Sequence, residues 1–436
     1  MPSQTPNTKS HSLAPEDPFA VLPPELLQAF TLHLDDSPAL LPLLLVSRYW
    51  YYSLIDTPLV WTRLTWAHKA PRDAAVRRLE RCIRLSGAAP LAVRVADGYG
   101  MHYAATAHAT GLYRLRAQMH RVMSLQLDVA GDASMYNLLR QLDVPVPLLR
   151  RLCVWNASRQ SDFAVGPMPG LLSAPNLKML LASNLPLEFV PADLTLLKAD
   201  VSSDVGGSQQ LEAVMLRNAN TLESLRFTGS PKNIADSQLL GTGCTYNFPA
   251  LRDLEVRGVP LGSLLGHMRA PSLITLSIAD VGTLASFDLL HSLPCLERLD
   301  VMDFALESNP SRQLHLPKLR RISVRLGIST TCNILTQVRA PLLELASIEF
   351  GPGVDPNADD NETLHHAMVA LVASSPVLTT LWYAKVTGKR TGVVTRWEVD
   401  VDEFREHIRA GDCDAREPRH HPPPTRPRGL SHAQSA

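Results

Sequence analysis

Residues 249–256, PALRDLEV, introduce a pattern of Pro-x-Leu-x-x-Leu-x-Val/Ile that recurs along the chain. The pattern returns as PSLITLSI at 271–278, PCLERLDV at 294–301 and PKLRRISV at 317–324, and its proline recurs at Pro341. Successive prolines lie 22, 23, 23 and 24 residues apart. Because self-similarity at a nearly constant period is the signature of repeat architectures, these copies predict a stack of similar structural units.

The pattern continues on both sides of this regular region. Further copies begin at Pro147, Pro175 and Pro376, and degenerate copies without the leading proline begin at Ala192 and Asn220. The spacing of these outer copies is looser, so the repeat boundaries there are less sharply defined than in the centre.

Each copy contains two apolar residues separated by one other residue, as in Leu276 and Ile278. This alternation predicts one short strand, and stacking successive strands in a parallel sheet buries the apolar face that a single strand leaves open. Segments between copies, such as 285–293 and 331–338, are long enough for a helix. We therefore predict an α/β fold with a solenoid over residues 146–385, which has one short parallel strand per repeat and helices or loops on its convex side.

The period of the central copies falls within the range of about 20–29 residues that is typical of leucine-rich repeats, which the region resembles. The copies lack the Asn or Cys that usually follows the strand in that family, so we describe the region as leucine-rich-repeat-like. The alternative interpretation is a set of unrelated strand-like runs in an ordinary α/β protein.

The segment from residue 22 to residue 64 carries more Leu, Pro and Trp than a helical unit of its size needs for its own core. Apolar residues at a helical period predict a first helix over 22–34. Ser37 with Pro38 suits the start of a second helix that ends near Val46, and Ser47 suits the N-cap of a third helix that ends near Ile55.

The order of residues in this segment resembles the F-box over its whole length. The agreement lies in Leu22-Pro23, Glu25-Leu26-Leu27, Phe30, Leu34, Leu45-Val46-Ser47-Arg48, Trp50, Leu54, Pro58-Leu59, Trp61 and Leu64. The resemblance implies a three-helix module over residues 19–66 that binds a Skp-type adaptor and thereby joins a cullin-RING ubiquitin ligase. It also implies nine adaptor contacts, at Leu22, Pro23, Leu26, Leu27, Leu45, Val46, Trp50, Leu59 and Trp61.

Pro42 is the one departure from the F-box pattern, because the family more often has a polar or charged helix former there. Proline lacks the backbone donor of a helix interior, so we expect Pro42 to delay the start of the second helix or alter its geometry. The alternative interpretation of residues 22–64 is an ordinary three-helix unit whose leucines are core residues.

Residues 67–145 predict an α/β connecting region. The string VRRLERCIRL at 76–85 indicates a basic amphipathic helix, and strands are expected at 91–95 and 122–129, with a helix from about 103 to 119 between them. The strings LERCIRLSGAAPLAVRV and HRVMSLQLDV within this region resemble the segment that follows the F-box in many proteins of mushroom-forming fungi. This resemblance implies a fungal origin and the same order of modules.

Composition argues against several classes of function. The chain has 42 Lys plus Arg and 42 Asp plus Glu, so no overall basic field favours nucleic acid or an anionic membrane. The longest leucine-rich run, at 39–46, is far shorter than the roughly 20 residues of a membrane-spanning helix, and residues 1–18 lack the apolar core of a signal peptide. We therefore expect a cytoplasmic or nuclear protein that binds neither membrane nor nucleic acid.

The six cysteines contain no C-x-x-C pair, which favours reduced thiols over a zinc ribbon or a disulfide scaffold. At the ends of the chain, residues 1–18 and the Pro/Arg-rich tail 415–436 are predicted to be disordered, because both have few large apolar residues. Residues 386–414 are predicted to form a C-terminal segment with a strand and a short helix.

No catalytic or metal-binding constellation is present in the sequence, and no cofactor is expected. Asp355, Asp359, Asp360 and Glu362 cluster in a Gly/Pro-rich loop, but their spacing misses the EF-hand pattern. Adjacent histidines at 365 and 366 would point about 100 degrees apart on a helix and so would not share one metal ion. The sequence therefore predicts a protein without catalytic activity that acts by binding.

On a solenoid, binding is expected at the outward strand positions. The outward residues predicted to contact a target are Arg151, Trp155, Arg226, Arg257, Arg298, Arg321, Arg325 and Trp382. If the repeats stack in register, the four arginines from 257 to 325 would form a basic band suited to an acidic or phosphorylated segment. The alternative is that they are solvated strand residues.

These observations predict a substrate receptor of a cullin-RING ubiquitin ligase, in which the F-box binds a Skp-type adaptor, which in turn binds a cullin, while the repeats bind an unknown target protein. The alternative is an F-box and leucine-rich-repeat scaffold that does not promote degradation. An enzyme with an unrecognised site and a repeat protein for nucleic acid are weaker interpretations.

Overall fold

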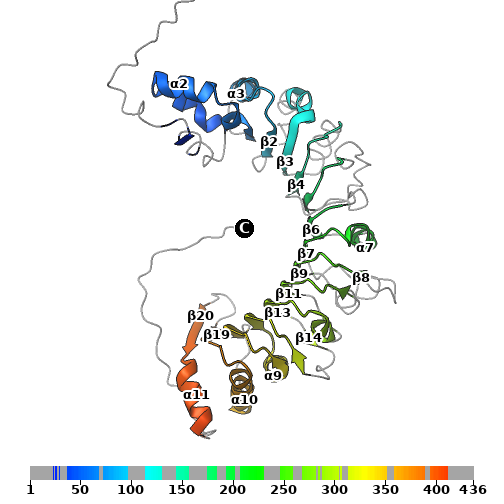
Figure 1. The fold of residues 1–436 in the computed structure, drawn as a ribbon, viewed down its shortest axis with the longest axis vertical. Helices are drawn as coiled ribbons and strands as arrows, with labels where there is room; N and C mark the ends of the chain where they lie inside the picture. Colours follow the sequence, from blue (N-terminus) through cyan, green and yellow to red (C-terminus); the bar gives the residue numbers. More distant parts are fainter. Residues whose placement is uncertain are drawn as a thin grey trace, which may run out of the picture. The chain divides into compact units, whose positions relative to one another are not determined.

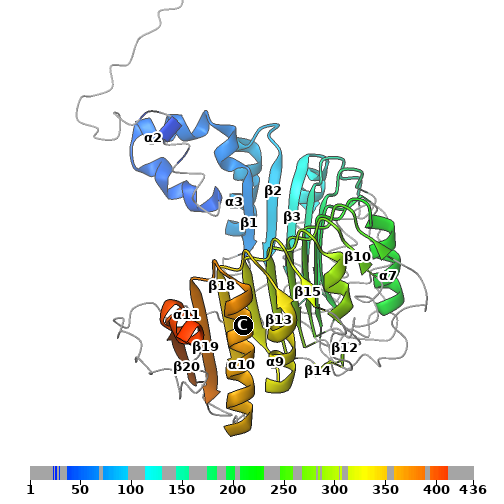
Figure 2. The same cartoon turned by 60° about the horizontal axis from the view of Figure 1, so that its bottom comes forward.

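The structure is a computed structural model of the 436-residue chain. It describes residues 23, 25–26, 29, 37–67, 72–96, 113–129, 144–156, 174–183, 193–201, 207–229, 246–258, 268–280, 283–284, 287–303, 305–306, 313–350, 358–387 and 393–410. The chain divides into two compact units, residues 1–181 and residues 182–436, and each combines parallel strands with helices (Figures 1 and 2).

Three short helices begin the well-described part of the N-terminal unit: η1 (Ser37–Leu45), α2 (Arg48–Ile55) and η2 (Pro58–Trp61). The side chains of Leu40, Leu44 and Leu54 are buried among them. The predicted N-cap of α2 is confirmed, since the Ser47 side chain accepts a hydrogen bond from the Trp50 backbone N–H at 3.3 Å. Most of the first predicted helix, 22–34, lies outside the described residues.

Pro42 changes the type of the second helix and does not delay its start. The helix begins at Ser37 and continues through Pro42 as a 3₁₀ helix of nine residues, although such helices rarely exceed about four residues. In an α-helix the proline ring would clash with the carbonyl of the residue four positions earlier. The expected late start is therefore wrong, and a tighter helix is the physical outcome of the proline.

The N-terminal unit continues as a parallel sheet whose strands follow chain order: β1 (Arg63–Ala67), β2 (Leu91–Ala96), β3 (Val122–Val129) and β4 (Arg151–Asn156). The predicted basic helix and both predicted strands of this region are confirmed, with the helix α3 spanning Arg72–Leu85. Residues 103–112 of the other predicted helix lie outside the described residues, whereas 113–116 are helical. β5 (Met179–Ser183) crosses the division between the units.

Arg121, in the turn η3 (Met119–Arg121), closes the C-terminal end of α3. Its Nη2 donates to the Ile83 carbonyl at 3.1 Å and to the Ser86 hydroxyl at 3.0 Å, and its Nη1 donates to the Ala89 carbonyl at 2.9 Å. Burial lowers the pKa of the Arg121 guanidinium. The arginine therefore satisfies acceptors that a helix C-terminus otherwise leaves open.

The C-terminal unit contains a sheet with one short strand per copy of the sequence repeat. Its parallel strands follow chain order: β6 (Leu196–Val201), β7 (Ser224–Gly229), β9 (Asp253–Arg257), β11 (Thr275–Ala279), β13 (Arg298–Met302), β16 (Arg321–Arg325), β18 (Leu345–Phe350) and β19 (Thr380–Thr387). β20 (Val393–Val399) ends the sheet as an antiparallel partner of β19. The predicted α/β class and parallel strand arrangement are confirmed, and they are compatible with a solenoid.

Corresponding residues of successive copies pair directly with each other. One buried row runs through Leu225, Leu254, Leu276, Leu299, Ile322, Ala346 and Leu381. A second buried row runs through Phe227, Val256, Ile278, Val301, Val324 and Ile348. The alternating apolar residues of the repeat thus form one continuous core, which no single strand could bury alone.

Short helices and short strand pairs connect the strands of the C-terminal unit. The helices are α7 (Gly207–Asn218), η6 (Phe287–Ser292), α9 (Ile328–Gln337), α10 (Ala358–Ser374) and α11 (Val401–Ala410). The short strands pair as β8 (Tyr246–Asn247) with β10 (Met268–Arg269), β12 (Thr283–Leu284) with β14 (Ala305–Leu306), and β15 (Leu314–His315) with β17 (Val338–Arg339). In Figure 1, α7, α9 and α10 lie on the same side of the sheet, which leaves its other face uncovered by them.

The proline that begins each copy occupies the second position of a turn. The Leu251 N–H bonds to the Phe248 carbonyl across Pro249 at 3.3 Å, and the Leu273 N–H bonds to the Ala270 carbonyl across Pro271 at 3.0 Å. Proline suits this position because its ring presets the backbone angle that the turn requires. The same backbone bond recurs in later copies, which explains why proline and leucine keep their spacing.

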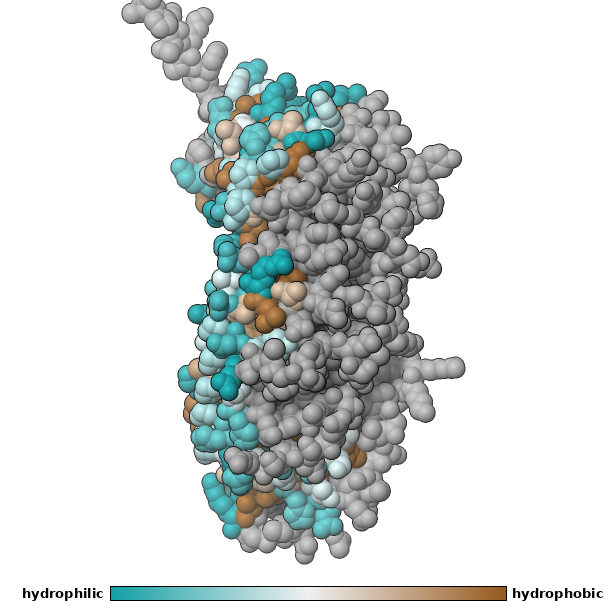
Figure 3. All heavy atoms as spheres, turned by 90° about the vertical axis from the view of Figure 1, so that its right-hand side faces the viewer, coloured by the Kyte–Doolittle hydropathy of each residue, from teal (hydrophilic) through white to brown (hydrophobic). Residues whose placement is uncertain are grey.

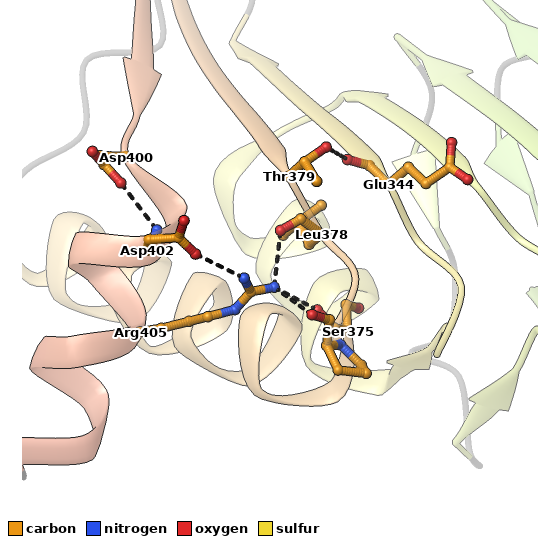
Figure 4. A network of polar contacts seen from close by, with 8 residues as sticks. Glu344, Ser375, Leu378, Thr379, Asp400, Asp402 and Arg405 are labelled. Carbon is orange, nitrogen blue, oxygen red and sulfur yellow. Dashed lines mark hydrogen bonds and ion pairs between the residues drawn. The ribbon is translucent and has the colours of Figure 1, made fainter.

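Arg405 on α11 binds the backbone of the turn that follows α10 (Figure 4). Its Nη2 donates to the carbonyls of Ser375, Pro376 and Leu378 at 3.2, 2.8 and 2.8 Å, and its Nη1 contacts Asp402 at 3.1 Å. These bonds attach the last helix to the segment that leads from α10 into β19.

Candidate protein-binding surfaces

The predicted adaptor contacts fall into three groups. Leu22 and Leu27 lie outside the described residues. Pro23 and Leu26 are exposed, as are Leu45, Val46 and Leu59, with Leu45 at 87% and Leu59 at 51% of full exposure. Trp50 and Trp61 are buried.

The burial of Trp50 and Trp61 assigns these side chains to the core of the helical unit, in place of the direct adaptor contact that we expected. Trp61 has no exposed surface, and its indole Nε1 donates to the Leu54 carbonyl at 2.7 Å. A buried indole contributes a large apolar area and needs one hydrogen-bond acceptor, which the carbonyl of Leu54 supplies. Both tryptophans therefore contribute to the stability of the helical unit that presents the exposed residues.

Two tyrosines that the sequence did not single out extend the exposed apolar surface. Tyr51 and Tyr52 on α2 are both exposed, and their rings make an edge-on contact with centroids 5.4 Å apart. With Leu45, Val46 and Leu59, these tyrosines make five exposed apolar or aromatic residues on the helical unit. In Figure 3, brown apolar residues lie among teal polar ones on the visible face of the N-terminal unit.

The predicted target contacts in the C-terminal unit lie on the face of the sheet that is opposite the buried rows. Three rows of side chains run across this face, and the middle row contains Arg226, Glu255, Asp300 and Trp382. Glu255 lies directly opposite Arg226 on the neighbouring strand. Trp382 is half-buried, opposite Ser347.

The four arginines expected to form a basic band do not do so. Arg298 lies opposite Arg321 in one outer row. Arg257 and Arg325 lie in the other outer row and are separated by two strands, whose residues in that row are Ala279 and Met302.

Carboxylates neutralise most of these cations. Arg298 Nε lies 2.8 Å from Asp300, Arg257 Nε lies 2.8 Å from Glu255, and Arg325 pairs with Asp303. The sheet face is therefore a mixed-charge surface, and the predicted band is corrected because three of the four arginines pair with an acid, on the same strand for Arg257 and Arg298 and just after the preceding strand for Arg325.

Arg321 is the exception on this face. It makes no ion pair within the described part of the chain, and its neighbour across the sheet, Arg298, has the same charge. Like charges on directly opposite positions of a sheet destabilise it. An incoming carboxylate or phosphate would relieve that repulsion, so Arg321 is the position of the face best prepared for an acidic group.

The remaining predicted target contacts are in the N-terminal unit, on β4. Arg151 is exposed, and its Nε contacts Cys153 Sγ at 3.4 Å. Trp155 is half-buried on the same strand. These two residues belong to a different unit from the mixed-charge face, so their positions do not test whether all eight predicted target contacts share one surface.

Among the described residues, no group of three or more His, Cys, Asp or Glu side chains could hold a metal ion. Of the predicted acidic loop, Asp355 and the side chains of Asp359 and Asp360 lie outside the described part, and Glu362 is exposed. His365 packs edge-on against Phe404 of α11 with centroids 5.4 Å apart. Burial, and then the nearby His366, lower the pKa of His365.

A search of the helices within the described ranges finds none with the length and apolar character needed to cross a bilayer. No protein-family model matches this chain, and no curated protein matches it. A functional assignment therefore rests on the residues themselves and on their contacts.

Proposed function

We propose that this chain is a non-catalytic substrate receptor of a cullin-RING ubiquitin ligase. In this proposal residues 19–66 are an F-box that binds a Skp-type adaptor, and the leucine-rich-repeat-like residues 146–385 bind a target protein. Other subunits transfer ubiquitin, and the receptor contributes by holding the target close to them, which raises its effective concentration. The cytoplasm or the nucleus is the compartment that this role requires.

The observation that carries the proposal is the exposure of apolar residues at positions where the F-box resemblance implies adaptor contacts. Leu45 and Leu59 are exposed, whereas Leu40 and Leu44 on the same helical unit are buried. The leucines thus divide into a group that forms the core and a group that the chain itself does not cover. Exposed apolar side chains gathered on a small helical unit are typical of a surface that another protein covers.

The mixed-charge face of the C-terminal unit supports the second half of the proposal. Exposed ion pairs such as Arg325 with Asp303 contribute at most about 1 kcal/mol, so a partner's charges can replace them at little cost. Trp382 and Arg321 are of the types enriched in the energetic centres of protein interfaces. The proposed target segment carries an acidic or phosphorylated group that reaches Arg321.

Adaptor binding tests the first half directly. The full chain and its Leu59→Asp variant would be incubated with an immobilised, purified Skp-type adaptor, and Leu216→Asp would serve as the matched control. Leu216 lies on α7 and is exposed to the same 51% as Leu59, so both variants place one charge on an exposed leucine position. We expect Leu59→Asp to lose adaptor binding and Leu216→Asp to keep it. If the adaptor does not bind the wild-type chain, the proposal is refuted.

The alternative is a scaffold that binds the adaptor and a partner without promoting degradation. The half-life of a captured partner, measured in cells with the wild-type chain and with Leu59→Asp, separates the two functions. A half-life that lengthens in the variant supports a receptor, and an unchanged half-life supports the scaffold.

A further inference from the structure

A hollow of about 700 Å³ lies between η1 and α3 in the N-terminal unit. We call it the basic hollow, because arginines dominate its lining. The residues that line it are Leu41, Ala74, Arg77, Arg78, Glu80, Arg81 and Arg84. All but Leu41 come from α3, which lies beside β1 in Figure 2.

The charges of the basic hollow are not balanced. Arg77, Arg78, Arg81 and Arg84 are all exposed, and none of them pairs with an acid within the described part of the chain. The one carboxylate in the lining, Glu80, lies 2.9 Å from Arg114, which is not part of the hollow. Four arginines without an ion pair among the described side chains therefore line the same space.

This arrangement is unfavourable for the isolated helix. Arg81 is one turn away from both Arg77 and Arg84, and like charges at that spacing destabilise a helix. Arginines near a helix C-terminus can compensate by binding the last carbonyls, but Arg121 already occupies that position on α3. Contacts with the end of the helix therefore do not compensate the positive charge of these arginines.

The spacing of the arginines indicates the shape of the ligand. At a rise of about 1.5 Å per residue, Arg77 and Arg84 lie roughly 10 Å apart along the helix, which is the length of about three extended residues. One phosphate could not reach both ends. We propose that the basic hollow binds an extended acidic segment of a partner protein, whose successive carboxylates contact Arg77, Arg81 and Arg84 while Leu41 and Ala74 provide an apolar floor.

A single-stranded nucleic acid fits the basic hollow less well. Proteins that bind single strands stack the bases on aromatic side chains along a positively charged groove. The lining of the hollow contains no aromatic residue, and the chain as a whole has no net charge. An acidic peptide needs the guanidinium groups but not the stacking platform, so it is the ligand that this composition favours.

A labelled hexaglutamate peptide tests the proposal by fluorescence anisotropy on the full chain. The test variant is Arg77→Glu/Arg81→Glu, and the control variant is Arg116→Glu/Arg150→Glu, which reverses two exposed arginines of the same unit outside the hollow. We expect the test variant to bind at least about tenfold more weakly and the control to keep most of the wild-type affinity, because losing two charge-assisted contacts removes more than an altered net charge does.

Additional variants and a second probe distinguish the proposed site from the alternatives. Arg77→Gln/Arg81→Gln removes the charges without adding acids, so weaker binding by both test variants supports the site even if one of them folds poorly. Equal affinities for the wild type and both test variants would overturn the proposal, as would hexathymidylate binding more tightly than hexaglutamate through the same arginines. Leu59→Asp should bind hexaglutamate like the wild type, which separates this site from adaptor binding.

Discussion

Arg298 and Arg321 face each other on the neighbouring parallel strands β13 and β16, yet among the described residues a carboxylate, that of Asp300, pairs only with Arg298. Asp300 is almost completely buried, at 9% of full exposure, so its charge acts in a partly desolvated place. This one acid therefore reduces the repulsion between two arginines, although it contacts only the nearer one.

Replacing Asp300 by Asn should lower the free energy of unfolding by about 1 kcal/mol, because the two arginines would then repel each other without compensation. Chemical denaturation at low and high salt measures the effect, which should shrink as salt screens the repulsion. Asp253→Asn is the matched control, since Asp253 lies in the same row as both arginines and has no ion pair within the described residues. A loss that is equally large at high salt would contradict the electrostatic explanation.

Replacing Arg121 by Met should destabilise the N-terminal unit by about 2–4 kcal/mol. Methionine preserves much of the side-chain volume but removes the donor to the Ala89 carbonyl and leaves the Ile83 carbonyl with the Ser86 hydroxyl as its remaining side-chain donor. Thermal unfolding measures the loss. Arg150→Met, at an exposed position of the same unit, should change stability very little, and a similar loss in both variants would show that the helix end does not depend on Arg121.

Replacing Arg405 by Met should loosen the turn that follows α10 and destabilise the C-terminal unit by about 1–2 kcal/mol, since three carbonyls lose a shared donor. Amide hydrogen exchange should accelerate in α11 and in the last turn of α10 before it does so in β13. Arg409→Met provides the control, because Arg409 is an exposed arginine on the same helix. Unchanged exchange in α11 after the loss of Arg405 would mean that other contacts hold this helix.

The attachment of α11 should also weaken in acid because of His365. Burial lowers the pKa of His365 in the folded chain below its ordinary value of 6.5, so the unfolded chain binds more protons as the pH falls through that value. Stability should therefore decrease as the pH falls below about 6.5 and level off below the folded-state pKa. Denaturation midpoints across the range from neutral to mildly acidic pH measure the trend.

His365→Gln should flatten that pH dependence because it removes the titrating ring. His315→Gln, which replaces an exposed histidine on β15, should leave it as in the wild type. If the His365 variant keeps the full acid sensitivity, another group is responsible for it.

The strands and their register could be predicted from the sequence because the residues that determine them lie within each copy. In residues 271–278, the leading proline determines the turn, and Leu276 with Ile278 determines which face is buried. These are local effects of backbone geometry and burial, and neither depends on a distant residue. The same reasoning predicted the Ser47 cap of α2, which involves residues only three positions apart.

The side-chain partners could not be predicted in the same way. The sequence showed arginines on successive strands, but whether Arg298 joins a band or binds Asp300 depends on side-chain rotamers in the folded sheet. Arg121 reaches back 38 residues to Ile83, a distance at which no sequence pattern signals a contact. The burial of Trp61 also depends on how three short helices pack, since an amphipathic pattern does not distinguish core from docking surface when both are apolar.

The proline turn at the start of each copy has a further consequence for how this chain can change over time. Because every copy sets its own turn and its own strand phase, an insertion between copies lengthens a connection without shifting the next strand. An inserted residue within a strand would exchange its buried and exposed faces, but the next proline would restore the phase. The outward residues of each strand can therefore be exchanged one copy at a time, so the mixed-charge face can diversify while the buried core beneath it stays the same.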